Sequence, residues 1–454
     1  MHIDISSLFA KEESHRYTLH TRYLNEQMVR VLKTIGYDVG FVRGHGQYLY
    51  DRAGNTYLDC LSGWGVFALG RNHPVIADAL RQVLNAELPG LVQMDVPVLA
   101  GILAQRLLKY APYMEKVFFA NSGTETAEAA IKFARAATGR SAIVYCSHAF
   151  HGLSYGALSL NGDTIFRKGL EGFLPDCHEV PFNDLTALEA QLKRYKVAAF
   201  FVEPVQGKGV NVPDEGYLQG VQTLCRKYGT LFVADEIQTG MGRTGRFFAV
   251  EHWNVEPDII LISKALSGGH IPVGALLTRK WIFDKLFNRM DRAVVHGSTF
   301  AKNDMAMAAG LAALAVFEDE HIIDNAAQQG AYLLGNLQAM GERFELIKEV
   351  RGEGLMIGIE FGEPKSLKLK MAWKGLEAVN IGLFCQMITI PLFKEHNIRC
   401  WPSVLRFAMH IEHESANGHG GIGAILHKFI PAFITGFSRI LAEGDEQIES
   451  MARR

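Results

Sequence analysis

The sequence is poor in several features that would signal a special environment, beginning with cysteine. It has six cysteines in 454 residues, and no two of them are spaced as a CxxC pair. In a chain of this length, scattered cysteines are typical of free thiols in a reducing compartment and not of a disulfide framework. We therefore expect a cytoplasmic protein. The six are Cys60, Cys146, Cys177, Cys225, Cys385 and Cys400.

Charge of one sign and long apolar runs are missing as well. The 46 basic and 48 acidic side chains give a formal net charge of -2, which provides no overall field for nucleic acid or an anionic membrane. The N-terminal stretch MHIDISSLFAKEESHRY is charged early and has no apolar core, so we expect no signal peptide. No run approaches the ~20 apolar residues that span a bilayer, and the short run IGLFCQMITIPLF predicts a buried helix.

Motifs of metal and dinucleotide sites are absent or out of context. The histidines are dispersed and no H-E-x-x-H or paired cysteines occur, so we expect no metal. The stretch Gly240–Gly245 fits G-x-G-x-x-G, but it does not lie directly between a strand and a helix. A dinucleotide site needs that context, so we interpret these glycines as a loop over a site.

What the sequence does have is a long alternation of short apolar runs and helical patterns. It extends from about residue 75 to residue 280, and the apolar runs are nearly continuous. This texture predicts an α/β fold with a mostly parallel sheet covered by helices on both faces. A length of 454 residues favours two domains. We expect residues 1–60 to pack with a small α+β domain of residues 316–454, and residues 61–315 to form the large domain. The segment 412–423, rich in His and Gly, gives no clear pattern.

Unusual residues follow five of the apolar runs. Ligands of open α/β sheets bind beyond the carboxyl ends of the strands, so five such residues at one edge predict a site. In chain order they are Asn121-Ser122-Gly123-Thr124 after VFFA, Phe150-His151-Gly152 after IVYC, Glu203 after VAAFFV, Asp235 after LFVA and Lys264 after IILIS.

Each of these positions has an ordinary alternative. Ser122 and Glu125 fit a capping box at a helix start that would suit a phosphate, although an ordinary capped helix is the commoner case. Asp235 at a strand end needs a cationic or proton-bearing partner, which a structural ion pair or an N-cap would also satisfy. Lys264 after a buried strand could be a nucleophile toward carbonyls or a lysine that reaches the surface.

Several long stretches resemble the class III aminotransferases, which depend on pyridoxal 5'-phosphate (PLP) and include ornithine, acetylornithine, 4-aminobutyrate and putrescine aminotransferases. They run from about residue 40 to residue 315 in the family's order, and the block from Leu231 to Ala275 is the most specific. The stretches are YLYDRAGNTYLDCLSGWGVFALGRNHP, FFANSGTETAEAAIKFARAATGR, FHGLSYGALSL, FVEPVQGKGV with GYLQGV, LFVADEIQTGMGRTGRFFAVEHWNVEPDIILISKALSGGHIPVGA and HGSTFAKN.

The resemblance implies a PLP-dependent transferase of fold type I that moves an amino group from an amine or amino acid to a keto acid such as 2-oxoglutarate or pyruvate. Lys264 would hold PLP as a Schiff base and shuttle a substrate proton, and Asp235 would keep the pyridine nitrogen protonated. Gln238 would hydrogen-bond the cofactor's phenolic oxygen, while Phe150 and Ile237 would cover the two faces of the ring.

The resemblance also implies a phosphate site and a partner subunit. Gly123 and Thr124 would bind the phosphate, and Thr299 would reach the phosphate of a neighbouring subunit, so we expect a homodimer with shared active sites. Glu203 would brace the site near the cofactor. The implied cofactor shell comprises Ser122, Gly123, Thr124, Phe150, His151, Gly152, Asp235, Ile237, Gln238, Lys264 and Thr299.

Departures from the family's pattern concern the substrate. Many relatives have a glutamate after Val-Gln-Gly that pairs with a C-terminal arginine, whereas this chain has Lys208. Arg406 is the closest local match to that arginine, with a weaker one near Lys428. Lys208 would attract an anionic group or leave room for a long apolar substrate, unless it is a solvated surface lysine.

Bulky apolar residues occupy positions that face the substrate in the family. They are Trp64, Val66 and Phe67, which favour an aliphatic or aromatic amine tail unless they belong to the core.

Two other functions stay open on the same residues. The cofactor shell alone does not fix the reaction, so a PLP-dependent decarboxylase, racemase or aminomutase is an alternative to an aminotransferase. A non-catalytic regulator on the same fold is a second alternative. The presence of both Lys264 and Asp235 argues against the regulator, which needs neither.

Overall fold

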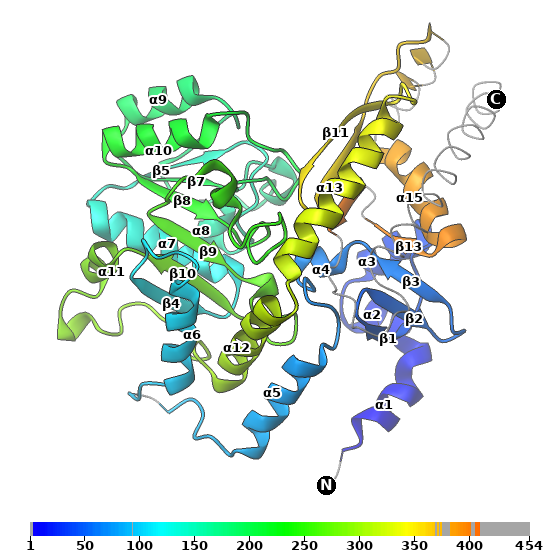
Figure 1. Cartoon of the computed structure of the whole chain (residues 1–454), viewed down its shortest axis with the longest axis horizontal. Coiled ribbons are helices and arrows are strands. Elements are labelled where there is room, and N and C mark those ends of the chain that lie inside the picture. Colours follow the sequence, from blue (N-terminus) through cyan, green and yellow to red (C-terminus); the bar gives the residue numbers. More distant parts are fainter. Residues whose placement is uncertain are drawn as a thin grey trace.

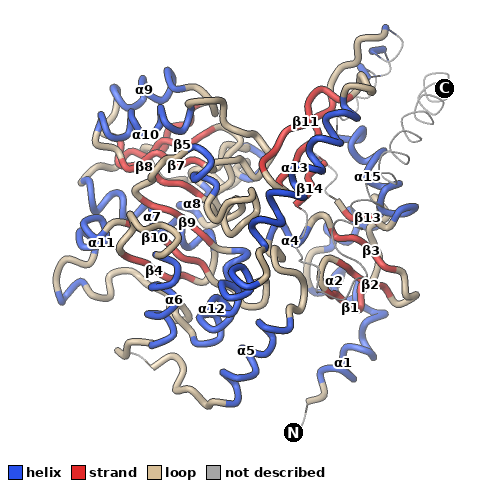
Figure 2. Tube along the Cα trace, viewed as in Figure 1, coloured by secondary structure: helices blue, strands red, loops and turns tan. Residues whose placement is uncertain are grey.

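The structure is a computed structural model and describes residues 3–92, 94–367, 370–371, 373–374, 382–400 and 405–408. Its strands form three sheets, of seven, four and three strands, which Figure 2 shows as separate red groups. Figure 1 places the seven-stranded sheet with its helices on the left and the two smaller sheets on the right.

The seven-stranded sheet has the order β4-β10-β9-β8-β7-β5-β6. All of its neighbours pair in parallel except β10, which is antiparallel to both β4 and β9. The strands are β4 (Lys116–Ala120), β5 (Ala142–Cys146), β6 (Cys177–Val180), β7 (Val197–Val202), β8 (Leu231–Asp235), β9 (Ile259–Ile262) and β10 (Gly274–Thr278).

The apolar runs of these strands are continuous because both faces of the sheet are buried. Alternate residues of a strand point to opposite faces, so Phe232 and Ala234 of β8 join one core cluster while Leu231 and Val233 join another. The helix α7 (Gly123–Thr138) packs across the face that holds Val233, with α11 (Lys280–Leu286) beside it. The opposite face holds α6 (Val98–Leu108), α9 (Leu185–Arg194), α10 (Tyr217–Tyr228) and α12 (Asp304–Asp319).

The other helices flank this sheet or lie in the smaller part of the chain. Their bounds are α1 (Ile5–Glu12), α2 (Arg16–Tyr23), α3 (Glu26–Thr34), α4 (Ser62–Gly65), α5 (Pro74–Asn85), α6 (Val98–Leu108), α8 (Tyr155–Leu158), α9 (Leu185–Arg194), α10 (Tyr217–Tyr228), α12 (Asp304–Asp319), α13 (Ile322–Gly341) and α15 (Gly382–His396). The short 3-10 helices are η1 (Glu13–His15), η2 (Thr164–Phe166), η3 (Ala249–Trp253), η4 (Lys264–Ser267) and η5 (Met290–Arg292).

The two smaller sheets bring distant parts of the chain together. The four-stranded sheet β1-β2-β3-β13 ends on a strand from near residue 400, and the N–H of Leu58 donates to the carbonyl of Asn397 at 2.8 Å. The three-stranded sheet β11-β12-β14 carries α13 on one side. These strands are β1 (Phe41–His45), β2 (Tyr48–Asp51), β3 (Thr56–Asp59), β11 (Ile347–Glu353), β12 (Met356–Phe361), β13 (Ile398–Arg399) and β14 (Leu405–Ala408).

The α/β fold class with a mostly parallel sheet and a smaller part is confirmed. The predicted domain boundaries stay predictions, and the one at residues 315/316 falls inside α12. The segment 412–423 and Lys428 lie outside the described residues. Across the part of the chain that the structure describes, no helix has the length and apolarity that crossing a membrane requires.

Two glycines of α13 allow a matched test of how the small sheet meets this helix. A Cβ on Gly330 would lie 2.2 Å from the backbone of Gly354, whereas a Cβ on Gly335 would meet nothing within 4 Å. We expect Gly330→Ala to lower the free energy of unfolding by about 1–3 kcal/mol through overpacking. Gly335→Ala should raise it by roughly 0.5–1 kcal/mol, because alanine favours helix. Thermal unfolding of both variants checks this, and equal shifts would contradict it.

Candidate active site

Five strands deliver their polar residues to one edge of the large sheet. β4, β9, β8, β7 and β5 run in the same direction, so their carboxyl ends meet at that edge. Asp235 ends β8, and Lys264 follows the neighbouring β9 after one residue. Glu203 follows β7 on the other side of β8. The strand ends that the sequence singled out are therefore neighbours in space.

A buried carboxylate lies at the centre of this edge. Asp235 is 2% exposed, and its Oδ2 lies 2.7 Å from Nδ1 of the buried His151. Its Oδ1 accepts the N–H of Ile237 at 3.1 Å. Burial lowers the pKa of His151, but the hydrogen bond to Asp235 and the charges of Asp235 and Glu203 raise it by more, so the net shift is upward. The imidazole of His151 therefore favours its charged form opposite the carboxylate of Asp235.

Lys264 stands beside that carboxylate in an unusual backbone conformation. It begins the 3-10 helix η4 with a φ of 40°, in the left-handed region. A non-glycine residue held there costs of order 1–3 kcal/mol, a strain found most often at functional sites. Its Nζ lies 3.5 Å from Oε1 of Gln238. The strained turn thus directs the amine toward the loop that follows Asp235.

Glu203 fixes two loops around the site. Its Oε2 accepts the N–H of Phe150 at 3.0 Å, and its Oε1 accepts the N–H of Gly207 at 2.9 Å. Burial raises the pKa of Glu203, and the charge of Asp235 adds to that rise while the charge of His151 opposes it. A Cβ on Gly207 would lie 2.1 Å from Oε1 of Gln238. Only glycine lets this backbone approach Gln238 so closely.

The helix α7 presents its N-terminus at the same edge. Oγ of Ser122 accepts the N–H of Glu125 at 3.3 Å, and Oε2 of Glu125 accepts the N–H of Asn121 at 2.7 Å. The predicted capping box thus reaches one residue further back than expected. The first N–H groups of a helix lack partners within the helix, so those of Gly123 and Thr124 suit an anion.

Several supporting residues escaped the sequence reasoning. The carboxylate of Glu128 accepts hydrogen bonds from the hydroxyl of Ser154 at 2.6 Å and from the N–H of Gly156 at 2.8 Å. Oγ of Ser154 also shares a hydrogen bond with Oγ1 of Thr124 at 2.7 Å. A Cβ on Gly152 would lie 2.3 Å from that same Oγ1. A helical glutamate and a serine 26 positions later carry no local signal in the sequence, because the contact joins separate elements.

Backbone geometry also brings the segment around Trp64 to the site. Residues 62–65 all have φ between 50° and 86°, a left-handed run. The buried Arg243 holds it by donating to the carbonyl of Gly65 at 3.1 Å, and a Cβ on Gly65 would lie 3.6 Å from Gln238. Trp64 is 44% exposed and Val66 is half-buried. Arg243 comes from the loop of Gly240–Gly245, which agrees with a loop over the site.

Three further predicted residues are Lys208, Thr299 and Arg406. Lys208 pairs with Asp163 at the rim. Thr299 is exposed, and the preceding Ser298 accepts Nδ2 of Asn121 of the same chain at 2.6 Å. Arg406 lies in β14, opposite Gly358, and the structure describes only its backbone. Among the described residues, no group of three or more His, Cys, Asp or Glu side chains could hold a metal ion.

Comparison with known proteins decides the family. A family profile described as aminotransferase class-III matches residues 34–401. The chain belongs to the class-III aminotransferase family. It is 36% identical over 429 residues to the aminotransferase PigE of a Serratia species, covering 87% of this chain and 50% of that protein. It is 40% identical over 355 residues to the putrescine aminotransferase of Pectobacterium atrosepticum, covering 75% of each.

Solved structures agree with this family. The ornithine aminotransferase of Toxoplasma gondii superposes with a TM-score of 0.82 at 28% identity, covering 98% of this chain and all of that one. A second structure of that enzyme has PLP at its active site. This class-III aminotransferase is a PLP-dependent transaminase of fold type I. It spans only about half the length of the Serratia relative.

The residues at the sheet edge fit PLP. Lys264 would supply an amine for the cofactor's carbonyl, and the buried Asp235 would supply an anion for its ring nitrogen. The N-terminus of α7 would supply donors for its phosphate. Gly207 and Gly152 stand where any side chain would collide with the shell. A lysine, a buried carboxylate and a helix N-terminus at one edge match the three polar ends of the molecule.

The His151–Asp235 pair predicts a pH dependence of stability in the PLP-free protein. A raised pKa means that the folded state holds the proton more tightly, so the stabilisation is complete below the unfolded value of about 6.5 and is lost as the pH rises through the folded value. His151→Gln keeps an N–H donor but cannot take up a proton. We expect the wild type to exceed this variant in melting temperature most at about pH 5.5, and by progressively less toward about pH 9. A difference that stays constant with pH would contradict the charged pair.

Proposed function

We propose that this class-III aminotransferase takes the amino group from a primary amine on an unbranched carbon chain and gives it to a 2-oxo acid. The observation that carries the reaction is the meeting of Lys264, Asp235 and Gln238 at the edge where α7 begins. The amine donor is supported by the relative named putrescine aminotransferase and by the partly exposed Trp64 beside the site. The free thiols of the described cysteines agree with a cytoplasmic location.

The chain's own residues divide the work of the reaction. PLP, when bound, supplies the electron sink that stabilises negative charge on the substrate carbon. Lys264 would hold the cofactor through Nζ and, once the substrate's amine takes its place, would move a proton to and from the substrate's amine-bearing carbon. Asp235, paired with His151, would keep a proton on the ring nitrogen. Gln238 orients Lys264 through their 3.5 Å contact.

The phosphate end and the ring faces are held by other elements. Gly123 and Thr124 bind the phosphate through the first turn of α7. Ile237, whose side chain packs against Gly123, would cover one face of the ring. Phe150, with its backbone fixed by Glu203, would cover the other face and exclude water. Binding and orientation thus come from backbone groups that the glycines allow to approach closely.

A homodimer completes this proposal. Large apolar side chains are exposed on the single chain around Thr299, including Val294 at 78% and Phe300 at 62%. Exposed apolar patches of this kind mark association surfaces, and a twofold dimer is the commonest oligomer. We propose that Thr299 reaches the phosphate site of the partner subunit.

The reaction is tested by a half-reaction without an acceptor. The protein loaded with PLP is mixed with a primary amine, and the cofactor is then extracted and identified. A transaminase leaves pyridoxamine phosphate, whereas a racemase or non-oxidative decarboxylase returns PLP. In Lys264→Ala the absorbance of lysine-bound PLP should disappear. The rate of pyridoxamine phosphate formation should fall more than about 100-fold, because the nucleophile and the proton shuttle are lost together. A variant with substantial turnover would end the assignment.

The shared site is tested by mixing two inactive variants. Lys264→Ala lacks the amine, and Thr299→Asp places a carboxylate against the phosphate. If Thr299 acts across the interface, a mixed dimer has one site with both native residues, and random exchange should restore about a quarter of wild-type activity. Sedimentation checks that dimers form. No recovery despite subunit exchange would place Thr299 in its own chain's site.

A further inference from the structure

An ion pair at the rim of the site is left unused by the mechanism. Lys208 lies in the loop after β7 and contacts Asp163, with side-chain exposures of 40% and 19%. The Nζ of Lys208 also lies 5.4 Å from the centre of the Phe166 ring. The cation is therefore held between a carboxylate and an aromatic face, and both charges remain reachable from solvent.

The pair lies directly beside the cofactor shell. The ring of Phe166 meets that of Phe150 edge-on, with centres 5.4 Å apart. Lys208 follows Gly207, whose backbone is pressed against Gln238, and Gln238 contacts the amine of Lys264. Gly207 and Gln238 thus lie between the ion pair and the amine of Lys264, and the ring of Phe166 lies between the pair and Phe150.

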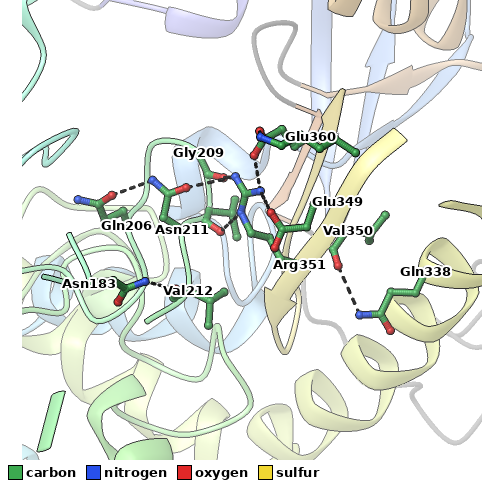
Figure 3. A network of polar contacts seen from close by, with 12 residues as sticks. Asn183, Gln206, Gly209, Asn211, Val212, Gln338, Glu349, Val350, Arg351 and Glu360 are labelled. Carbon is green, nitrogen blue, oxygen red and sulfur yellow. Dashed lines mark hydrogen bonds and ion pairs between the residues drawn. The ribbon is translucent and has the colours of Figure 1, made fainter. Parts of the chain in front are cut away.

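The backbone that carries Lys208 is fixed from the opposite side. Arg351 of β11 donates to the carbonyls of Val210 at 2.9 Å and Gly209 at 2.8 Å, and it reaches Oδ1 of Asn211 at 3.2 Å. Figure 3 shows this network, in which Glu349 and Glu360 hold the guanidinium from β11 and β12. The loop therefore stays in place while the exposed end of Lys208 can change partners.

An aminotransferase admits two substrates in turn, and their distal ends can carry opposite charges. We propose that the Lys208–Asp163 pair selects both: Asp163 receives the distal ammonium of a diamine donor, and Lys208 receives the distal carboxylate of a dicarboxylic 2-oxo acid. The ammonium of the donor takes the place of Lys208 beside Asp163, and the carboxylate of the acceptor takes the place of Asp163 beside Lys208. The side chain that binds the substrate therefore keeps an opposite charge beside it. This inference rests on the proposed aminotransferase function and names its substrate classes.

The test compares matched substrates in Asp163→Asn and Lys208→Gln. The donors are 1,4-diaminobutane and butylamine, which differ by the second ammonium. The acceptors are 2-oxoglutarate and pyruvate, which differ by the second carboxylate. Asp163→Asn should lower kcat/KM at least about fivefold for the diamine alone, and Lys208→Gln should do so for 2-oxoglutarate alone, since each loses a charge-assisted contact. The proposal would be overturned if kcat/KM changed equally for the two donors or for the two acceptors, or if it did not change at all.

Two controls separate recognition from disruption. In the double variant neither charge is left unpaired. If the pair is merely structural, kcat/KM should recover toward the wild-type value. If the pair selects substrates, the double variant should lose the preference for the diamine and the preference for 2-oxoglutarate. Lys280→Gln breaks an exposed Lys–Asp pair with Asp284 on α11 and should leave kcat/KM unchanged for all four substrates. Binding of glutarate to the PLP-loaded protein, followed by thermal shift, should weaken at least about fivefold in Lys208→Gln without any turnover.

Failure of this inference is distinct from failure of the proposed function. If the wild type converts no amine in the half-reaction, the aminotransferase proposal itself is wrong. If the wild type transaminates normally and the variants treat each pair of substrates alike, only the charge selection is wrong.

Discussion

A carboxylate placed at the end of an interior strand constrains everything around it. Asp235 is nearly inaccessible to water, and an ionised carboxylate can stay there only with cationic or hydrogen-bonding partners. His151 provides one and the N–H of Ile237 provides another. The two come from different loops, so a single buried charge fixes the loop after β5 against the loop after β8. Glu203 extends the same arrangement to the loop after β7, because its carboxylate holds the N–H groups of Phe150 and Gly207.

The loop of residues 203–212 is one place where the two parts of the protein meet. Its first residue braces the cofactor side, Gly207 packs on Gln238, and its last residues are held by Arg351 from the three-stranded sheet. Few side chains in this loop can vary freely, because each end is tied to a different sheet. Lys208 is the member whose charged end faces outward, and it lies between the two fixed ends.

The meeting of Asp235, Glu203 and Lys264 at one sheet edge could be predicted from the sequence because its signals are local, while their roles toward the cofactor stay predictions. A strand buried on both faces reads as a continuous apolar run, and the residue that follows it is located to within one position, as with Asp235 after LFVA and Lys264 after IILIS. The supporting residues could not be found in this way. Glu128 lies on the α7 face turned toward Ser154, Arg243 reaches Gly65 across 178 positions, and Arg351 reaches Val210 across 141 positions. Such partners are specified by the packing of separate elements. The left-handed φ of Lys264 likewise has no sequence signal, since the surrounding turn imposes it.

The pairing of β3 with β13 sets an order on how the protein can be made. The two strands are parallel neighbours, yet the side chains of Asp59 and Arg399 that meet across them are 340 positions apart. During synthesis β3 leaves the ribosome about 340 residues before β13, and the edge beside β3 stays open over that interval. Long-range closure of this kind is slow, and an open strand edge invites pairing with other chains. A nascent chain that holds β3 without β13 is therefore exposed to misassembly at this edge, and the four-stranded sheet closes only after the region around Arg399 has been made.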